Sequence, residues 1–264
     1  MLKINPFYEL SSLVPSFIMQ IFIIFMLLMV IFGTLIDTIH KKNVKYFFLN
    51  AKKAKKSAKV KLSKSKRTSV ILKTIASDIA TTSELGFGKR RLAHVLGMYG
   101  TILFWLASAV MVFKYSTPGS NTPIFWPYAW HIGAIMTCIG GYWFWFFLRV
   151  DVYSEANPWY RVIKADLFVL ALLACATSGL VWSLTQSSGM EKTSLLFLFL
   201  FVISNLILFG GVYWSKFAHM FYKPGAAIQK NLAEADGSRD NLPPPADAPE
   251  QFGLGIKREQ PKHY

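Results

Sequence analysis

The sequence is poor in cysteine and in acidic side chains. Its 264 residues include two cysteines, Cys138 and Cys175, and 14 acidic residues against 29 lysines and arginines. Two isolated cysteines cannot hold an iron–sulfur cluster, which uses four thiolates or close substitutes, and the C-x-x-C-H motif of covalent haem is absent. Both cysteines fall within apolar runs, so we interpret them as small packing residues. If electrons reach or leave this chain through clusters, another subunit carries those clusters.

Long apolar runs dominate what is present. The hydrophobic fraction is 53%, the aromatic fraction is 16% and the mean hydropathy is +0.35. Five runs approach the ~20 residues that a helix needs to cross ~30 Å of hydrocarbon; they cover residues 16–35, 92–113, 126–148, 167–184 and 194–213. Because spanning segments must satisfy their backbone internally, we predict an all-α protein of the cell membrane, a multi-pass bundle of five transmembrane helices. These runs contain no carboxylate, and no two of them are interrupted by glycine or proline in corresponding positions, as transporter helices often are. A transporter is therefore a weak hypothesis.

Charge placement predicts the orientation and the organisation of the chain. Residues 41–91 hold sixteen lysines and arginines against two acidic residues, whereas the loop 115–125 holds no acidic residue and only neutral side chains. The positive-inside rule therefore predicts an N-terminus outside and a cytoplasmic C-terminus. We divide the chain into an N-terminus with the first transmembrane helix (1–40), a basic cytoplasmic loop (41–91), a four-helix transmembrane core (92–230) and a polar, Pro-rich cytoplasmic tail (231–264).

The net charge of +15 does not indicate nucleic acid as a partner. Most of the excess lies between Lys41 and Arg67, beside a predicted span, where orientation and anionic membrane lipid explain it. Residues 69–82 carry apolar side chains at helical spacing and are either an amphipathic helix, on the membrane or against a partner, or part of a solvated loop. The tail is either an arm that lies on a partner or a disordered segment.

Two histidines share a predicted membrane depth on different helices. His94 begins the second span and His219 follows the fifth, so both lie toward the cytoplasmic side. Two imidazoles at one depth could ligate a haem b iron between the helices. Gly97 and Gly100 would leave room for the macrocycle, and three nearby cations could pair with its propionates: Arg90, Arg91 and Lys216. The alternative is that both histidines make hydrogen bonds at the interface.

The segment around His219 resembles a known family. Tyr213-Trp-Ser-Lys-Phe-Ala-His-Met-Phe-Tyr-Lys-Pro224 is similar to the end of the fifth helix in the membrane cytochrome b subunits of respiratory nitrate reductase (gamma subunit) and of heterodisulfide-reductase-like complexes. The segment from Arg90 to His94 resembles the start of that family's second helix, and shorter likenesses extend to about Lys230. The resemblance implies a quinone-linked respiratory electron-transport subunit in which His94 and His219 ligate haem b.

The family's second haem is where this sequence departs from the pattern. The two positions that would hold its iron fall near Phe104 and Phe201, and phenylalanine cannot ligate iron. His131, about 7 Å deep in the third span from the outer side, could substitute with Met111 as its partner, because His/Met ligation is known in haem proteins. Lys114 is a weaker partner. Otherwise His131 lies near a quinol pocket or is an interfacial histidine.

These observations lead to two functional hypotheses. The first is a membrane anchor subunit of a larger oxidoreductase complex, rather than a stand-alone enzyme, which carries electrons between the quinone pool and a cytoplasmic iron–sulfur subunit through haem b. One haem is expected and a second is left open. The second hypothesis is a haem-free structural subunit that anchors or stabilises a multi-subunit membrane complex, which the missing ligand positions and the large basic loop favour.

Overall fold

The computed structural model describes residues 2–85, 88–148, 160–214, 217 and 219–238, and these residues form helices with no strand among them. The α-helices are α1 (Pro6–Leu10), α2 (Ser16–Lys41), α3 (Asn43–Lys56), α4 (Lys64–Thr74), α5 (Lys89–Lys114), α6 (Phe125–Trp143), α7 (Leu167–Ser187), α8 (Glu191–Gly210) and α9 (His219–Ala235). Short π-helical segments, η1 (Ile75–Ala80) and η3 (Phe144–Leu148), extend α4 and α6, and 3-10 turns form η2 (Ser83–Leu85) and η4 (Lys164–Asp166).

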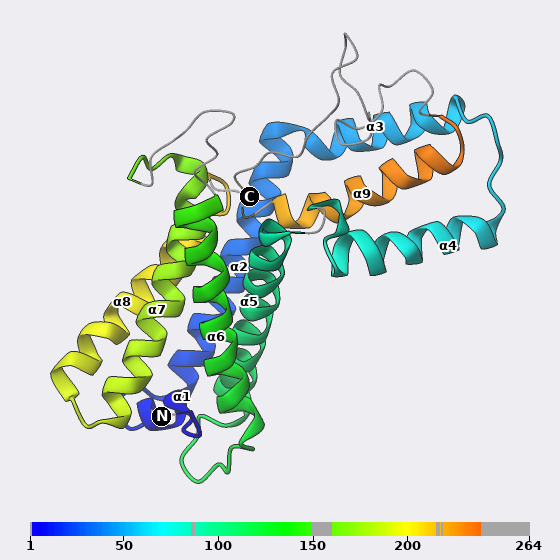
Figure 1. Ribbon diagram of the computed structural model, residues 1–264. Helices are drawn as coiled ribbons and strands as arrows, with labels where there is room; N and C mark the ends of the chain where they lie inside the picture. The colour runs from blue at the N-terminus through cyan, green and yellow to red at the C-terminus, as the bar shows by residue number, and fades with distance from the viewer. Residues whose placement is uncertain (1, 86–87, 149–159, 215–216, 218, 239–264) are drawn as a thin grey trace.

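Five of these helices are long and apolar enough to cross a membrane, which confirms the all-α class and the expected number of spans. They are α2, α5, α6 with η3, α7 and α8. Their bounds follow the apolar runs closely, except that α2 continues six residues past residue 35, to Lys41. The five helices run side by side as one bundle (Figure 1). Large apolar side chains stay exposed on its outer surface, as expected of helices surrounded by hydrocarbon.

Glycines bring α5 and α6 into backbone contact. A Cβ atom on Gly133 of α6 would lie 2.6 Å from the backbone nitrogen of Phe104, and one on Gly140 would lie 2.5 Å from the carbonyl oxygen of Ala93. On α5, a Cβ on Gly100 would lie 2.6 Å from the backbone nitrogen of Thr137. Small residues allow this approach, which supplies the dispersion contacts that hold membrane helices together.

The end of the bundle nearest α1 (hereafter the α1 end) has an aromatic core. Asn5 caps α1 through hydrogen bonds to the backbone N–H groups of Phe7 and Tyr8, and its amide donates to the carbonyl oxygen of Tyr115, 3.0 Å away. These bonds fold α1 across the spans, so that Phe7 packs against Trp130 and Trp182. The core of this end is therefore built from residues distant in sequence.

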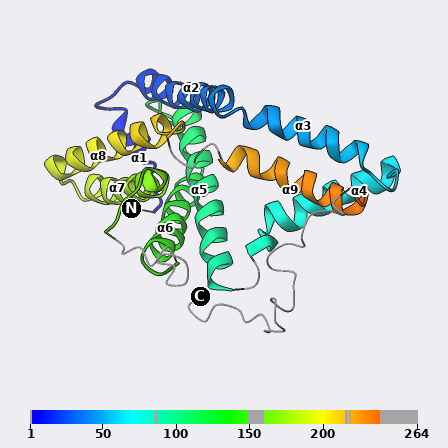
Figure 2. The same ribbon diagram turned by 90° about the horizontal axis from the view of Figure 1, so that it is seen from above.

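At the opposite end (the α9 end), α3, α9 and α4 project sideways from the bundle, roughly across the direction of the spans (Figures 1 and 2). Lys42 has a left-handed backbone (φ 52°), which separates α2 from α3 where the chain turns. The α9 helix lies between the other two. Its Asn231 donates to Thr74 Oγ1 at 2.9 Å and to Asp78 Oδ2 at 2.7 Å, while the carbonyl oxygen of Asp236 accepts from Lys59 and Val60.

This three-helix layer changes the expected organisation in two places. The basic loop 41–91 contains α3 and α4, and the boundary at residue 231 falls inside α9, whose last turn packs in the layer. The hypothesis of an amphipathic helix at 69–82 agrees with the second half of α4 and with η1. Tail residues 239–264 lie outside the described residues.

Candidate functional site

The candidate haem site lies where α5 begins and α9 starts. His94 is in the second turn of α5 with an exposed side chain, and it is near enough to Lys223 of α9 for the two to interact electrostatically. His219 is the first residue of α9, about one turn before Lys223. The fold thus brings the part of α9 that carries Lys223 toward the α5 turn that carries His94, and the side chain of His219 itself lies outside the described residues.

Phe217 anchors the segment that leads into α9. Its side chain is 1% exposed and stacks on Trp105 of α5, with ring centroids 5.9 Å apart and planes 12° apart. It also packs edge-on against Phe168 and contacts Phe209. Because this ring is fixed in the bundle, the residue two positions before α9 is held at Trp105 of α5. Lys216, one of the expected propionate partners, lies outside the described residues.

The open space expected beside His94 exists at one glycine and not at the other. A Cβ atom at Gly97, one turn after His94, would meet no atom within 4 Å. Gly100 is instead occupied by the backbone of α6, as described above. Arg91 donates from Nε to the carbonyl oxygen of Thr81 at 2.7 Å and so ties the start of α5 to the turn that follows η1. Because Gly97 is open and Gly100 is covered by α6, a planar group could lie against His94 and Gly97 but not against Gly100.

His131 is fully buried and has protein partners at both ring nitrogens. Nδ1 lies 2.7 Å from the carbonyl oxygen of Pro127, and Nε2 lies 2.8 Å from Ser183 Oγ on α7. Neither nitrogen presents a free lone pair to a metal. Met111, its expected partner in an outer haem, is 0% exposed and belongs to the apolar core of the α1 end.

Aromatic rings fill the depth at which the resemblance implies a second haem. Phe104 lies 5.1 Å from Trp130 and 6.4 Å from Phe201 between ring centroids, and Trp182 stacks on Phe201 at 5.6 Å. All four side chains are at most 8% exposed. Rings packed at these distances leave no slot for a porphyrin, so the residues present do not fit a haem at this depth.

A buried polar cluster at the α9 end was missed by the sequence analysis. Asp37 of α2 is 2% exposed, and the hydroxyl of Tyr222 on α9 hydrogen-bonds with Thr38 Oγ1. Thr34 Oγ1 and Trp105 Nε1 are buried without a hydrogen-bond partner. The apolar run ends at residue 35, so the sequence gave no sign that α2 continues past it and that Asp37 is buried there.

Other metal chemistry has little support in the described residues, which contain no cluster of three or more His, Cys, Asp or Glu side chains. Cys175 is fully buried, and Cys138 Sγ lies 3.6 Å from Thr177 Oγ1. Both cysteines lie inside the bundle, in agreement with their interpretation as packing residues.

Comparison with known proteins identifies no relative: no family model, no curated protein and no solved structure matches this chain. The likeness around His219 therefore stays a prediction, and the function must be argued from the residues.

Proposed function

We propose that this protein is the membrane anchor of a respiratory redox complex, with its N-terminus outside and its C-terminus in the cytoplasm. In this proposal His94 and His219 hold one haem b, which supplies one-electron transfer between the quinone pool and a cytoplasmic iron–sulfur subunit. The supporting observations are the open space at Gly97, one turn after His94, and the electrostatic interaction of His94 with Lys223, which lies about one turn after His219.

The remaining residues of the site would position these ligands and keep water out. Phe217 and Trp105 hold the start of α9 against α5 through their stacked rings. Arg91, bonded to Thr81, fixes the first turn of α5. Apolar packing around a redox group lowers the local dielectric and restricts solvent, which are the protein's means of tuning its potential.

The lysine-rich end of α3 is the proposed docking surface for the cytoplasmic subunit. Four exposed lysines lie there, Lys52, Lys53, Lys55 and Lys56. In Figure 1, α3 is the helix of the layer farthest from the spans. A basic surface at that place would attract an acidic partner from the aqueous side.

The test is a reduced-minus-oxidised optical spectrum of the solubilised protein, with haem quantified per chain. A b-type band at one haem per chain, lost in His94→Ala and in His219→Ala, is expected. His40→Ala is the matched control, because His40 is an exposed histidine at the same end of the bundle. Gly97→Leu adds a steric test: its Cβ would meet no atom within 4 Å, so the protein should fold, and the added side chain should exclude haem.

The alternative is a haem-free structural anchor. The aromatic packing of Phe104, Trp130, Trp182 and Phe201 favours it, since a bundle that has filled one cofactor position can also be stable without any. A folded preparation with its native partners and no haem would establish this alternative and overturn the cytochrome proposal.

A further inference from the structure

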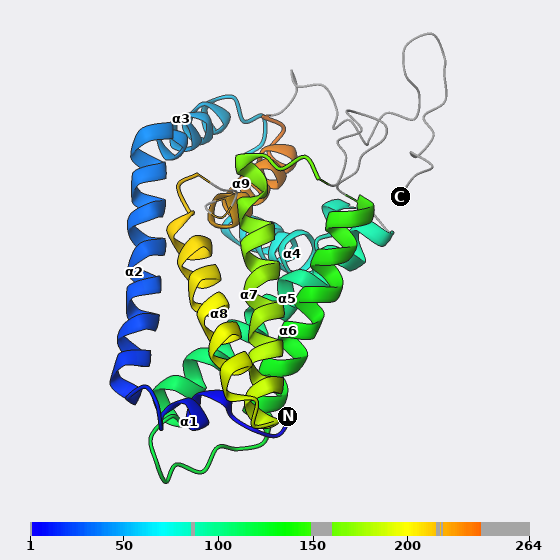
Figure 3. The same cartoon turned by 90° about the vertical axis from the view of Figure 1, so that its left-hand side faces the viewer.

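The α4 helix overhangs the region beside the bundle where lipid lies. Figures 1 and 3 both place α4 on the side of the three-helix layer nearest the spans, at the level of the first turns of α5, with α9 and then α3 farther away. No other described helix lies beneath α4 in Figure 1. The candidate membrane span of α5 begins at this level, with Lys89, so the space under α4 would be at the height of the lipid headgroups.

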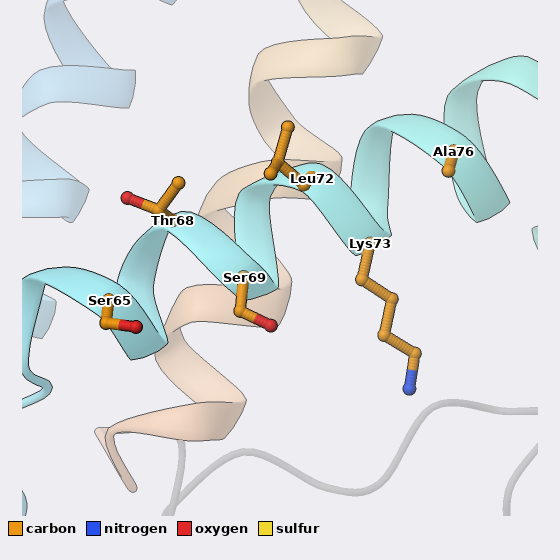
Figure 4. A pocket seen from close by; sticks show the side chains of 6 residues that line it. All are labelled: Ser65, Thr68, Ser69, Leu72, Lys73 and Ala76. Atoms are coloured by element: carbon orange, nitrogen blue, oxygen red, sulfur yellow. The ribbon is translucent and has the colours of Figure 1, made fainter.

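The two faces of α4 differ in chemistry. The face toward α9 carries Thr74, which is 2% exposed and accepts a hydrogen bond from Asn231. The opposite face forms a shallow open hollow along the helix, and Figure 4 shows its side chains with α9 behind them. That face combines three hydroxyls, an ammonium group and two apolar side chains: Ser65, Thr68, Ser69, Lys73, Leu72 and Ala76.

The charged side chains of α4 are all basic. The helix carries Lys64, Lys66, Arg67 and Lys73 and no acidic residue, and all four cations are exposed. The nearest carboxylate in sequence, Asp78, is bound to Ser77, Ser83 and Asn231 on the other side. Leu72 is 61% exposed and Ile75, which follows α4, is 43% exposed.

We infer that α4 is a lipid-binding helix that lies in the headgroup layer and binds anionic phospholipids of the membrane that the bundle spans. Ser65, Thr68 and Ser69 would donate hydrogen bonds to a lipid phosphate, and Lys73 would pair with its charge. Leu72 and Ile75 would contact the upper acyl chains, as apolar side chains of interfacial helices do. This inference goes beyond the proposed function and does not depend on haem.

Lipid explains these observations better than an acidic protein partner does. An acidic protein could form ion pairs with the four cations of α4, but it would have to occupy the space at headgroup height beside α5. Exposed Leu72 and Ile75 at that height also match the boundary between headgroups and acyl chains. Each lysine or arginine near an anionic bilayer surface strengthens binding by about fivefold.

The test is hydrogen–deuterium exchange of the full-length protein in nanodiscs of phosphatidylcholine, with and without phosphatidylglycerol. Phosphatidylglycerol is expected to slow exchange across residues 64–76 by roughly tenfold or more. The variant K64Q/K66Q/R67Q/K73Q should lose this protection. K52Q/K53Q/K55Q/K56Q removes the same charge from α3 and should keep it.

Two further measurements make the result decisive. Leu72→Asp changes an exposed side chain and should reduce the protection without unfolding the layer, which unchanged exchange in α9 would verify. Equal exchange of residues 64–76 in both kinds of nanodisc would overturn the inference. So would an equal loss in the α3 variant, or protection that appears only when the native partner subunits are present, which would assign the surface to a protein.

Discussion

The Nε2 atom of His131 lies 2.8 Å from the hydroxyl oxygen of Ser183, and this hydrogen bond joins α6 to α7 inside the membrane-spanning bundle. The other ring nitrogen is held by the Pro127 carbonyl one turn earlier, at 2.7 Å. Both polar positions of the imidazole are thus used for structure. The bond also fixes the position of α7 relative to the aromatic core, because Trp130 of that core immediately precedes His131 on α6.

Replacing His131 should therefore lower stability and leave the haem content unchanged. His131→Leu leaves Ser183 and the Pro127 carbonyl without this partner, at a cost of about 1–3 kcal/mol in the free energy of unfolding. Ser183→Ala removes one hydrogen bond and should cost about 1 kcal/mol. Thermal unfolding in detergent and haem quantification check both. A drop in haem per chain with His131→Leu in a folded protein would instead support an outer haem.

A role of His131 in quinol oxidation can be measured separately. If quinol binds beside it, a histidine that accepts the released proton is needed for reduction by quinol but not by a small reductant. His131→Gln should then slow quinol-dependent haem reduction by about a hundredfold or more, on the order of a general-base effect, while dithionite reduces the variant fully. Unchanged quinol kinetics would exclude this role.

The glycine contacts between α5 and α6 predict that one added methyl group lowers stability at Gly133 and Gly140 but not at Gly97. Gly133→Ala and Gly140→Ala place a Cβ within 2.6 Å of α5 backbone atoms, so the helices must separate, and we expect a loss of about 1–3 kcal/mol. Gly97→Ala is the control on α5, because its Cβ would meet nothing within 4 Å. Unfolding of all three variants in the same detergent should rank Gly97→Ala as the most stable.

The aromatic core should be far more sensitive than the surface of the same helix. Phe201 of α8 is 8% exposed and contacts Phe104 and Trp182, whereas Phe199 is 60% exposed. Phe201→Ala opens a cavity and should cost about 3–5 kcal/mol, as such truncations do in packed cores. Phe199→Ala should change the unfolding temperature little. Similar losses for both would mean that the ring cluster is not the core of the α1 end.

The contact between α9 and η1 should weaken in acid. Partial burial would raise the pKa of the Asp78 carboxyl, but hydrogen bonds from Ser83, Ser77 and Asn231, with the charge of Lys230, outweigh it and lower the pKa below the ordinary value of 3.8. The charged form is therefore the stabilising one. Its contribution is complete above pH 3.8 and is lost as the pH falls through the lowered pKa.

Asn231→Ala tests the same contact at neutral pH. The substitution removes donors to Asp78 and Thr74, and we expect the amides of α9 to exchange roughly tenfold faster, a change of ~1.4 kcal/mol. Asn50→Ala, an exposed asparagine on α3, is the control and should leave α9 unchanged. Equal exchange in both variants would show that other contacts hold α9 in the layer.

Much of the fold followed from the pattern of apolar residues. The five runs predicted five spans, and four of their helices begin and end within a few residues of the runs. At the site, the sequence predicted free space at Gly97, and the structure agrees. It did not predict the bonds of His131, because Pro127 shares its helix but Ser183 is 52 residues away.

The sequence by itself determined the number of spanning helices and their lengths, because burial in hydrocarbon depends on how long an apolar run is. Only the tertiary structure decided which sides of those helices meet. The sequence predicted free space for a ligand at Gly100, but the backbone of α6 occupies it. Phe104 of α5 and Phe201 of α8 are distant in sequence and belong to one aromatic cluster because the two helices pack together. Contacts of this kind depend on shape across distant segments, which a linear pattern of hydropathy does not encode.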